Sequence, residues 1–194
     1  MKKILTILSI VLISKSAYAN ELQKILSDAN KYTVKISNST NTPFIEDSYN
    51  ASFGSGILID KTNGIIITNA HVSSYSPSIN RVNFKYSDPI QSKQIYIDPE
   101  IDLAFLQVDP KSIPKEAIEA KLQCKNDYKQ GQNVVAFGHP NGKDFTITRG
   151  IISAIRYETD FFESIQTDAA INGGNSGGAL IDISSGLVVG INSF

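Results

Sequence analysis

Residues Ala170 to Leu180 read AINGGNSGGAL, with four glycines around a single serine and an apolar run starting directly after it. Glycine permits positive φ angles and close approach of the backbone to other groups. This cluster therefore indicates a tight loop whose backbone N–H groups are directed toward another chemical group. A serine hydroxyl becomes a useful nucleophile beside a histidine base and in front of N–H donors that hold an oxyanion. The alternative interpretation is a Gly/Ser-rich turn between two strands.

Outside this loop the chain consists mainly of short β-rich segments, and an amphipathic helix is predicted only for residues 21–31. Strands are predicted at residues 32–36, 51–59, 65–68, 81–86, 94–97, 103–108, 133–137, 145–155, 163–167, 178–183 and 187–191. So many short strands with so little helix predict an all-β sandwich or barrel rather than βαβ units.

An irregular connection near residues 111–130 divides these strands into two halves, at about residues 32–110 and 131–194. Ligand sites commonly lie in clefts between two such halves. We therefore expect one domain built of two β-halves, with the functional site in the cleft between them.

The first residues are typical of a secretory signal peptide. Lys2 and Lys3 precede a mostly apolar run over residues 4–13, and the segment SKSAYA ends with an A-x-A cleavage pattern at Ala19. A bilayer span needs about 20 apolar residues, so this run is too short for a stable membrane anchor. We expect cleavage after Ala19 and a mature chain, residues 20–194, in the periplasm or outside the cell.

The composition of the chain argues against several classes of partner and cofactor. The chain has 194 residues, of which 41% are hydrophobic, which is enough for a substantial core. A formal net charge of −1 gives no reason to expect a nucleic-acid partner. Cys124 is the only cysteine and there are only two histidines, so we expect no intramolecular disulfide and no structural zinc site. We also expect no metal and no cofactor in the reaction.

The two histidines differ in their surroundings. His71 follows the apolar strand at residues 65–67 and precedes the polar stretch 73–80, which favours a position on the rim of a cleft. His139 lies in the sequence Gly-His-Pro, where a local structural role is the better interpretation. His71 is therefore the candidate base.

A catalytic histidine needs a carboxylate to fix its tautomer and to stabilise the imidazolium. Asp102 stands at the start of an apolar strand, where burial of a carboxylate is costly without a partner, but Asp98 and Glu100 remain competitors. The order His71, Asp102, Ser176 is that of the two-barrel serine proteases. An α/β-hydrolase would need a histidine after the serine and alternating strands and helices, and the chain has neither.

These motifs resemble those of trypsin-like serine proteases of the HtrA (Deg) type. The resemblance rests on TNAHV at residues 68–72, DLA at 102–104 and GNSGGAL at 174–180, supported in the same order by FGSG at 53–56, GHP at 138–140 and QTDAAIN at 166–172. It covers the chain from about Tyr32 onward and implies an all-β fold of two six-stranded antiparallel β-barrels of the chymotrypsin type. The family's second barrel normally continues beyond the strand at 187–192, so we expect this barrel to be incomplete at the C-terminus. We also expect a protease domain alone, without the PDZ domains that usually follow it.

The resemblance also implies roles for individual residues. His71 would be general base and acid, Asp102 its orienting partner, and Ser176 the nucleophile. The backbone N–H groups of Gly174 and Ser176 would form the oxyanion hole. The substrate-binding residues would be Ala170, Ile171, Ile191 and Asn192.

The expected function is that of a serine endopeptidase that cleaves unfolded or misfolded polypeptides. Because Ala170 and Ile171 carry no charge, a small or medium apolar side chain is expected in the S1 pocket. The family resemblance also suggests a homotrimer. The alternative is a protease-fold protein that binds unfolded polypeptide without cutting it, because an incomplete second barrel would leave S1 unformed.

Overall fold

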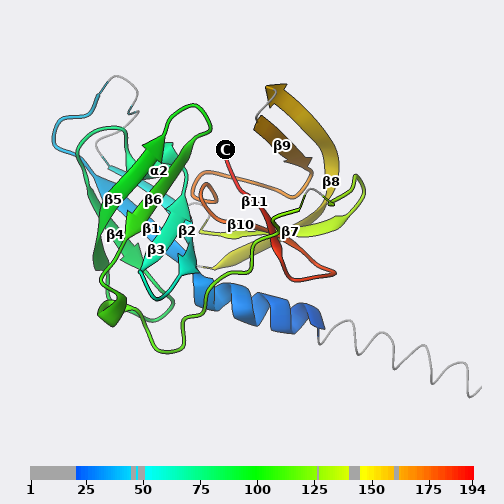
Figure 1. The fold of residues 1–194 in the computed structure, drawn as a ribbon, viewed down its shortest axis with the longest axis horizontal. Coiled ribbons are helices and arrows are strands. Elements are labelled where there is room, and N and C mark those ends of the chain that lie inside the picture. The colour runs from blue at the N-terminus through cyan, green and yellow to red at the C-terminus, as the bar shows by residue number, and fades with distance from the viewer. Residues whose placement is uncertain (1–20, 45–46, 48–50, 126, 140–144, 160–161) are drawn as a thin grey trace, which may run out of the picture.

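The computed structural model describes residues 21–44, 47, 51–125, 127–139, 145–159 and 162–194; the expected signal peptide lies outside them. They form two β-sheet halves beside each other, with a helix at residues 21–32 running along one side of both (Figure 1). The apolar face of this helix, with Leu22, Ile25 and Leu26, packs against the hydrophobic core. The predicted helix and its buried face are therefore confirmed.

The first half is a closed barrel with the strand order β1-β2-β3-β6-β5-β4, and every neighbouring pair is antiparallel. Its strands are β1 (Thr33–Ser39), β2 (Ala51–Asp60), β3 (Ile65–Thr68), β4 (Ile79–Asn83), β5 (Ile90–Asp98) and β6 (Leu103–Gln107). A single-turn helix α2 (Ala70–Ser73) follows β3, and a 3₁₀ turn η1 (Pro110–Ser112) follows β6. A closed barrel leaves no free strand edge, which removes a route to aggregation.

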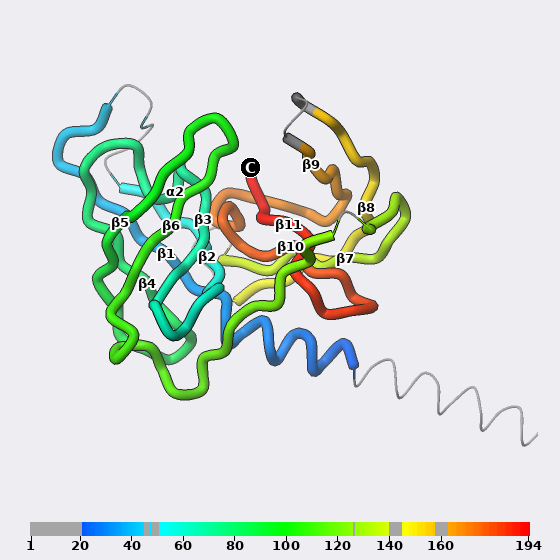
Figure 2. Tube along the Cα trace, in the orientation of Figure 1, coloured from blue at the N-terminus to red at the C-terminus, as the bar shows by residue number. Residues whose placement is uncertain are grey.

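The second half is an open, curled sheet of five strands in the order β11-β10-β7-β8-β9 (Figure 2). Its strands are β7 (Asn133–Gly138), β8 (Thr146–Thr159), β9 (Phe162–Thr167), β10 (Ala179–Asp182) and β11 (Val188–Ile191). Part of the outer edge of β11 is covered, because Val188 donates to the Lys121 carbonyl at 2.9 Å and accepts from the Gln123 N–H at 2.8 Å. This sheet confirms the expected all-β fold with an incomplete second barrel.

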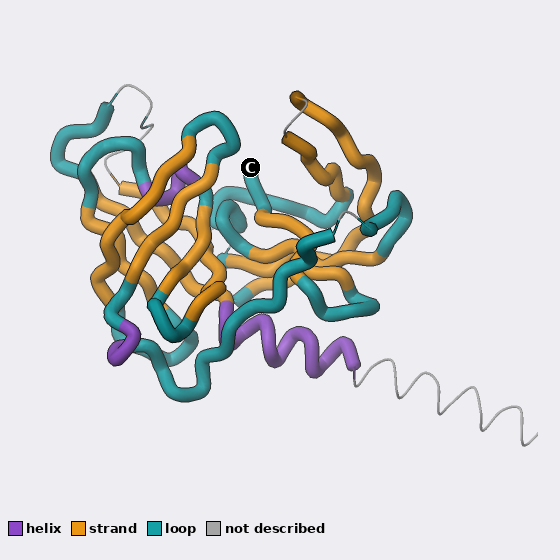
Figure 3. The backbone as a smooth tube through the Cα atoms, viewed as in Figure 1, coloured by secondary structure: helices purple, strands orange, loops and turns teal. Residues whose placement is uncertain are grey.

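Every strand predicted from the sequence has a counterpart, and the connection between the halves is irregular, as Figure 3 shows. The differences are at strand ends: β5 begins at residue 90 rather than 94, β8 ends at 159 rather than 155, and β4 occupies residues 79–83 where 81–86 was predicted. The strand ends early because Phe84 and Ser87 form a turn, in which the Phe84 carbonyl accepts from the Ser87 N–H at 3.1 Å. Tyr86 within it has a φ of 63°.

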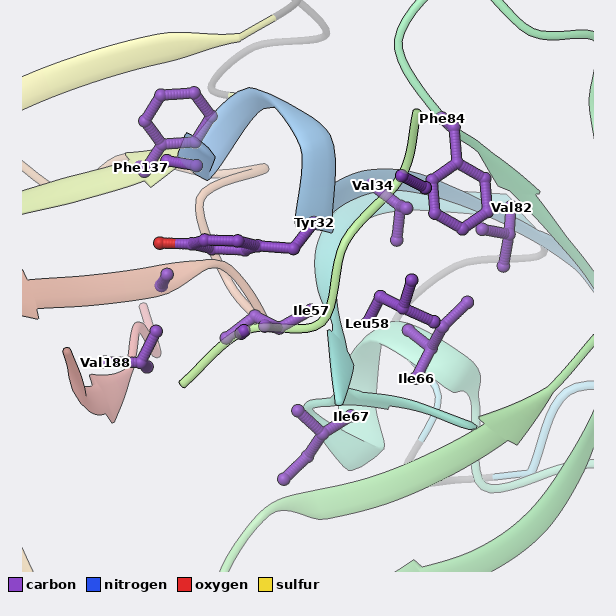
Figure 4. Packing of buried hydrophobic residues seen from close by; sticks show 14 of the residues in the cluster. Tyr32, Val34, Ile57, Leu58, Ile66, Ile67, Val82, Phe84, Phe137 and Val188 are labelled. Carbon is purple, nitrogen blue, oxygen red and sulfur yellow. The ribbon is translucent and has the colours of Figure 1, made fainter. Parts of the chain in front are cut away.

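One hydrophobic cluster joins the two halves. Ile57 of the first barrel and Phe137 and Val188 of the second sheet belong to it, as does Tyr32 at the end of the N-terminal helix (Figure 4). Phe137 is essentially fully buried, and burying an aromatic side chain contributes about 1.5–3 kcal/mol to stability. The shared core fixes the position of one half relative to the other, and with it the site at their junction.

Candidate active site

Strand pairing brings His71 and Asp102 to the same edge of the first barrel. Strand β3 pairs with β6 so that Thr68 lies opposite Ala104. His71 comes three residues after Thr68, in helix α2, and Asp102 comes two residues before Ala104. Residues far apart in the chain thus meet through the register of a single strand pair.

The Asp102 carboxylate contacts both the ring and the main chain of His71. The His71 Nδ1 atom lies 2.8 Å from Asp102 Oδ2 and 3.0 Å from Oδ1. The His71 backbone N–H also donates to Oδ1 at 3.0 Å. Because the carboxylate faces Nδ1, that nitrogen carries the proton in the neutral ring, and Nε2 is left as the acceptor.

The competing acids are placed elsewhere. Asp98 Oδ1 accepts from the Glu100 N–H at 3.0 Å and its Oδ2 from the Tyr96 hydroxyl at 3.2 Å. Within the described residues neither Asp98 nor Glu100 has a hydrogen bond to His71. The choice that the sequence left open is therefore decided by the fold in favour of Asp102.

Burial of the Asp102 carboxyl raises its pKa, but hydrogen bonds from the His71 ring and backbone, the His71 charge and a hydrogen bond from Ser193 outweigh this effect. The net pKa lies below its usual value. The Ser193 hydroxyl supplies its bond to Oδ2 at 3.1 Å from just beyond β11. Asp102 is thus ionised at neutral pH and contacts both halves of the molecule.

The backbone of Asp102 is held by Asn69, which the sequence analysis did not single out. Asp102 has a φ of 52°, a left-handed conformation that few residues other than glycine adopt. Asn69 precedes helix α2, where its side chain would be expected to cap the helix, but it makes no capping bond and instead donates from Nδ2 to the Asp102 carbonyl at 2.9 Å. No sequence pattern marks Ser193, because its partner lies 91 residues away.

Ser176 lies in a tight loop at the edge of the second sheet and is only 3% exposed. Gly174 and Gly177 have φ angles of 98° and 83°, as the glycine cluster predicted. The loop is tied to the first barrel by a hydrogen bond of 2.8 Å from the Ser55 N–H to the Ser176 carbonyl. Since Ser55 belongs to β2, which pairs with β3, the serine loop is anchored beside the strand that leads to His71.

The N–H groups of the loop fall into two classes. Those of Asn175, Gly177 and Gly178 donate to backbone carbonyls at 2.8–2.9 Å. Those of Gly174 and Ser176 form no hydrogen bond with any described residue. Unpaired donors on either side of Asn175 are the arrangement that binding of an oxyanion requires.

His71 and Ser176 are not hydrogen-bonded to each other within the described part of the chain. Hydrogen bonds between catalytic groups are often long in unliganded enzymes and shorten when substrate binds. The fold therefore joins His71 directly to Asp102 and places Ser176 on an adjoining loop.

The four expected substrate-binding residues flank the serine loop. Ala170 is exposed and its carbonyl accepts from the Thr148 hydroxyl at 2.8 Å, whereas Ile171 packs against a small cluster within the second sheet. Ile191 packs against the main core. Asn192 is buried, with its side-chain amide donating to the Ala179 carbonyl at 3.2 Å, so its side chain points into the sheet.

The described residues contain no cluster of three or more histidine, cysteine or acidic side chains that could hold a metal ion. Cys124 is an exposed free thiol. Among the helices in the described ranges, none is long and apolar enough to cross a membrane.

We expect Gly177→Ala to destabilise the protein by about 2–4 kcal/mol, from left-handed strain plus overpacking. A methyl group at Gly177 would lie 2.0 Å from the Ser55 carbonyl oxygen and 2.3 Å from Thr68 Oγ1, and the φ of 83° disfavours any other residue. Gly173→Ala is the matched control, because a methyl group there meets nothing within 4 Å. Urea unfolding of both variants measures the difference, and equal midpoints would show that the loop is not packed against β2.

Comparison with protein families and curated proteins shows to which family the chain belongs. The trypsin-like peptidase domain family matches residues 54–191. A probable periplasmic serine endoprotease DegP-like of Pseudomonas fluorescens is 43% identical over 145 residues, which cover 73% of this chain and 29% of that protein. The periplasmic serine endoprotease DegP of Escherichia coli K12 is 36% identical over 146 residues, covering 73% and 30%. The chain thus matches less than a third of the length of these relatives.

Solved structures show the same similarity. The HtrA-type protease AlgW with a tripeptide superimposes with a TM-score of 0.74 at 32% identity, covering 91% of this chain and 54% of that one. A serine endoprotease from Yersinia pestis gives a TM-score of 0.72 at 29% identity, covering 89% and 57%. The chain belongs to the trypsin-like peptidase family and is similar in both sequence and fold to its HtrA-type, DegP-like members.

Proposed function

We propose that this chain is the catalytic part of a serine endopeptidase that cleaves unfolded or misfolded polypeptides through an acyl-enzyme. The observation that carries the proposal is the contact of Asp102 with both the ring and the backbone of His71. This contact leaves His71 Nε2 as the available base.

In the proposed reaction, Ser176 Oγ attacks the scissile carbonyl carbon while His71 Nε2 takes the hydroxyl proton. Substrate binding would bring His71 and Ser176 into hydrogen-bonding distance. The negative charge on the former carbonyl oxygen would be held by the N–H groups of Gly174 and Ser176, which no described protein group occupies. Removing one such donor typically slows an acyl transfer by about 10²–10³-fold.

His71 would then return its proton to the leaving amine as the C–N bond breaks, which leaves an ester between Ser176 and the acyl half of the substrate. Water, deprotonated by His71, hydrolyses this ester and restores the serine. The ionised Asp102 stabilises the imidazolium in both steps.

The substrate class and the compartment follow from the resemblance rather than from a bound ligand. The curated relatives are named periplasmic endoproteases, and the expected signal peptide agrees with action in the periplasm or outside the cell. Ala170 and Ile171 are uncharged, which supports a small or medium apolar side chain in S1. A homotrimer stays a prediction.

A second candidate function is binding of unfolded polypeptide without cleavage. The open five-stranded second sheet supports it. A fold by itself does not guarantee its usual activity.

The test uses the purified mature chain, with circular dichroism to verify folding. We expect a fluorophosphonate probe to modify the peptide that contains Ser176, and unfolded casein to be cut while a stably folded protein is not. A folded chain that neither reacts nor cuts would contradict the enzymatic proposal. If that inactive chain also delays aggregation of an unfolded protein, binding without cleavage becomes the better account of its function.

A further inference from the structure

Ser55 in strand β2 is fully buried and forms several hydrogen bonds across the junction of the two halves. Its N–H donates to the Ser176 carbonyl at 2.8 Å, and its hydroxyl donates to the Gly174 carbonyl at 2.8 Å. The same hydroxyl lies 3.0 Å from the His139 backbone nitrogen and 3.1 Å from His139 Nδ1. Its carbonyl accepts from the Thr68 hydroxyl at 2.7 Å.

Counting protons assigns a direction to each of these bonds. A serine hydroxyl has one proton and two lone pairs. The Gly174 carbonyl can only accept, so the Ser55 proton goes there. The His139 backbone N–H can only donate and uses one lone pair of Ser55 Oγ, so the other lone pair accepts a hydrogen bond from His139 Nδ1–H. All the hydrogen-bonding capacity of the Ser55 hydroxyl is used, which locks its rotamer.

His139 is itself held in place. It is buried, it follows the end of β7, and its ring meets the Phe145 ring edge-on with centroids 4.7 Å apart. The space around this pair is tight, because a methyl group at Gly138 would lie 2.9 Å from Ser55 Oγ. The ring thus presents Nδ1 to Ser55 in one orientation.

We propose that Ser55 and His139 are positioning residues for the oxyanion site. Ser55 holds the carbonyls of Gly174 and Ser176, the two residues whose N–H groups are unpaired. The two carbonyls belong to the peptide units 174–175 and 176–177, which flank the unit that carries the Ser176 N–H, and the first of them directly follows the Gly174 N–H. Holding these two units restricts the φ and ψ rotations that would turn either N–H group away. His139 acts through Ser55, because its Nδ1 keeps the hydroxyl turned toward Gly174. The catalytic part of this inference rests on the proposed function.

The kinetic test compares Ser55→Ala with Asp182→Ala. Asp182 is a buried polar residue at the opposite end of β10, and its carboxylate accepts hydrogen bonds from Ser184 and Ser185. We expect Ser55→Ala to lower kcat by about 10–100-fold, somewhat less than loss of an oxyanion donor itself, with KM changed less than about twofold. Affinity for a peptide aldehyde, which forms a hemiacetal oxyanion, should fall by a similar factor. Asp182→Ala should lower the free energy of unfolding, but kcat and the affinity for the aldehyde, both measured per active site, should stay at the wild-type values.

A double-mutant cycle tests whether His139 acts through Ser55. His139→Leu removes the ring donor and should lower kcat, whereas His139→Asn, whose Nδ2 can donate from the equivalent position, should restore most of it. In the Ser55→Ala background, His139→Leu should cause no further loss of kcat. Independent, multiplying losses would overturn the assigned coupling.

A readout without catalysis separates this inference from the proposed function. In ¹⁵N-glycine NMR spectra, the Gly174 amide should shift or broaden in Ser55→Ala and stay unchanged in Asp182→Ala. If the wild type is inactive but the Gly174 amide still changes in Ser55→Ala, the enzymatic proposal is contradicted and the positioning role is supported. If wild type is active and Ser55→Ala leaves both kcat and the Gly174 amide unchanged, the positioning role is wrong.

Discussion

Replacing Ser176 with alanine is expected to lower kcat by about 10⁶-fold, the cost of removing the nucleophile from a catalytic triad. The loss should fall on kcat rather than KM, because the hydroxyl is proposed to act in bond formation and not in holding the substrate. Reaction with a fluorophosphonate should be abolished. Single-turnover cleavage of a peptide ester and mass spectrometry of the labelled chain measure both effects.

The same substitution should leave stability almost unchanged. The Ser176 hydroxyl makes no hydrogen bond to any described residue, so its removal strands no buried partner. Ser184→Ala, which changes an exposed serine in the same half, is the kinetic control and should behave as wild type. A Ser176→Ala preparation that cuts as fast as wild type would mean that another nucleophile, or a contaminating protease, does the work.

Replacing Asp102 with asparagine is expected to lower kcat by about 10⁴-fold, because the histidine is then held in the wrong tautomer. The structure shows why the amide has one preferred orientation. The His71 backbone N–H lies 3.0 Å from Oδ1 and requires an acceptor there. The NH₂ group of the asparagine therefore occupies the position of Oδ2, which lies 2.8 Å from Nδ1. That NH₂ group donates to Nδ1, moves the ring proton to Nε2 and removes the base.

The matched control is Asp98→Asn, which changes a half-buried acid that contacts Tyr96 and Glu100 instead. It should leave kcat within about twofold of wild type, as surface changes away from a site usually do. Steady-state kinetics on one peptide substrate compare the two variants. Equal losses in both, or a loss only in Asp98→Asn, would reject Asp102 as the partner of His71.

Strand content could be predicted well because it depends on local patterns. The alternation of apolar residues and the turn residues between them are visible in the sequence, and each predicted strand has a counterpart. Errors occur at the ends of strands. The apolar pattern predicts that β4 ends at residue 86, but the hydrogen bond of a turn ends it at residue 83. The incomplete second barrel was expected from the resemblance, which is a comparison with other chains and not a property of the local sequence.

The sequence by itself determined the serine loop, the two candidate histidines and the order of the candidate catalytic residues. It did so because glycine at positive φ and a serine within a glycine cluster are local features, as the angles at Gly174 and Gly177 show. Family membership also follows from these motifs and from their order.

Only the tertiary structure decided which groups meet. Asp102 rather than Asp98 faces His71 because of the β3–β6 register. The bonds from Ser193 to Asp102 and from Ser55 to Gly174 join residues 91 and 119 positions apart. Such contacts depend on how two sheets pack through a shared core, and no local pattern encodes them, because each partner alone is an ordinary serine, aspartate or glycine.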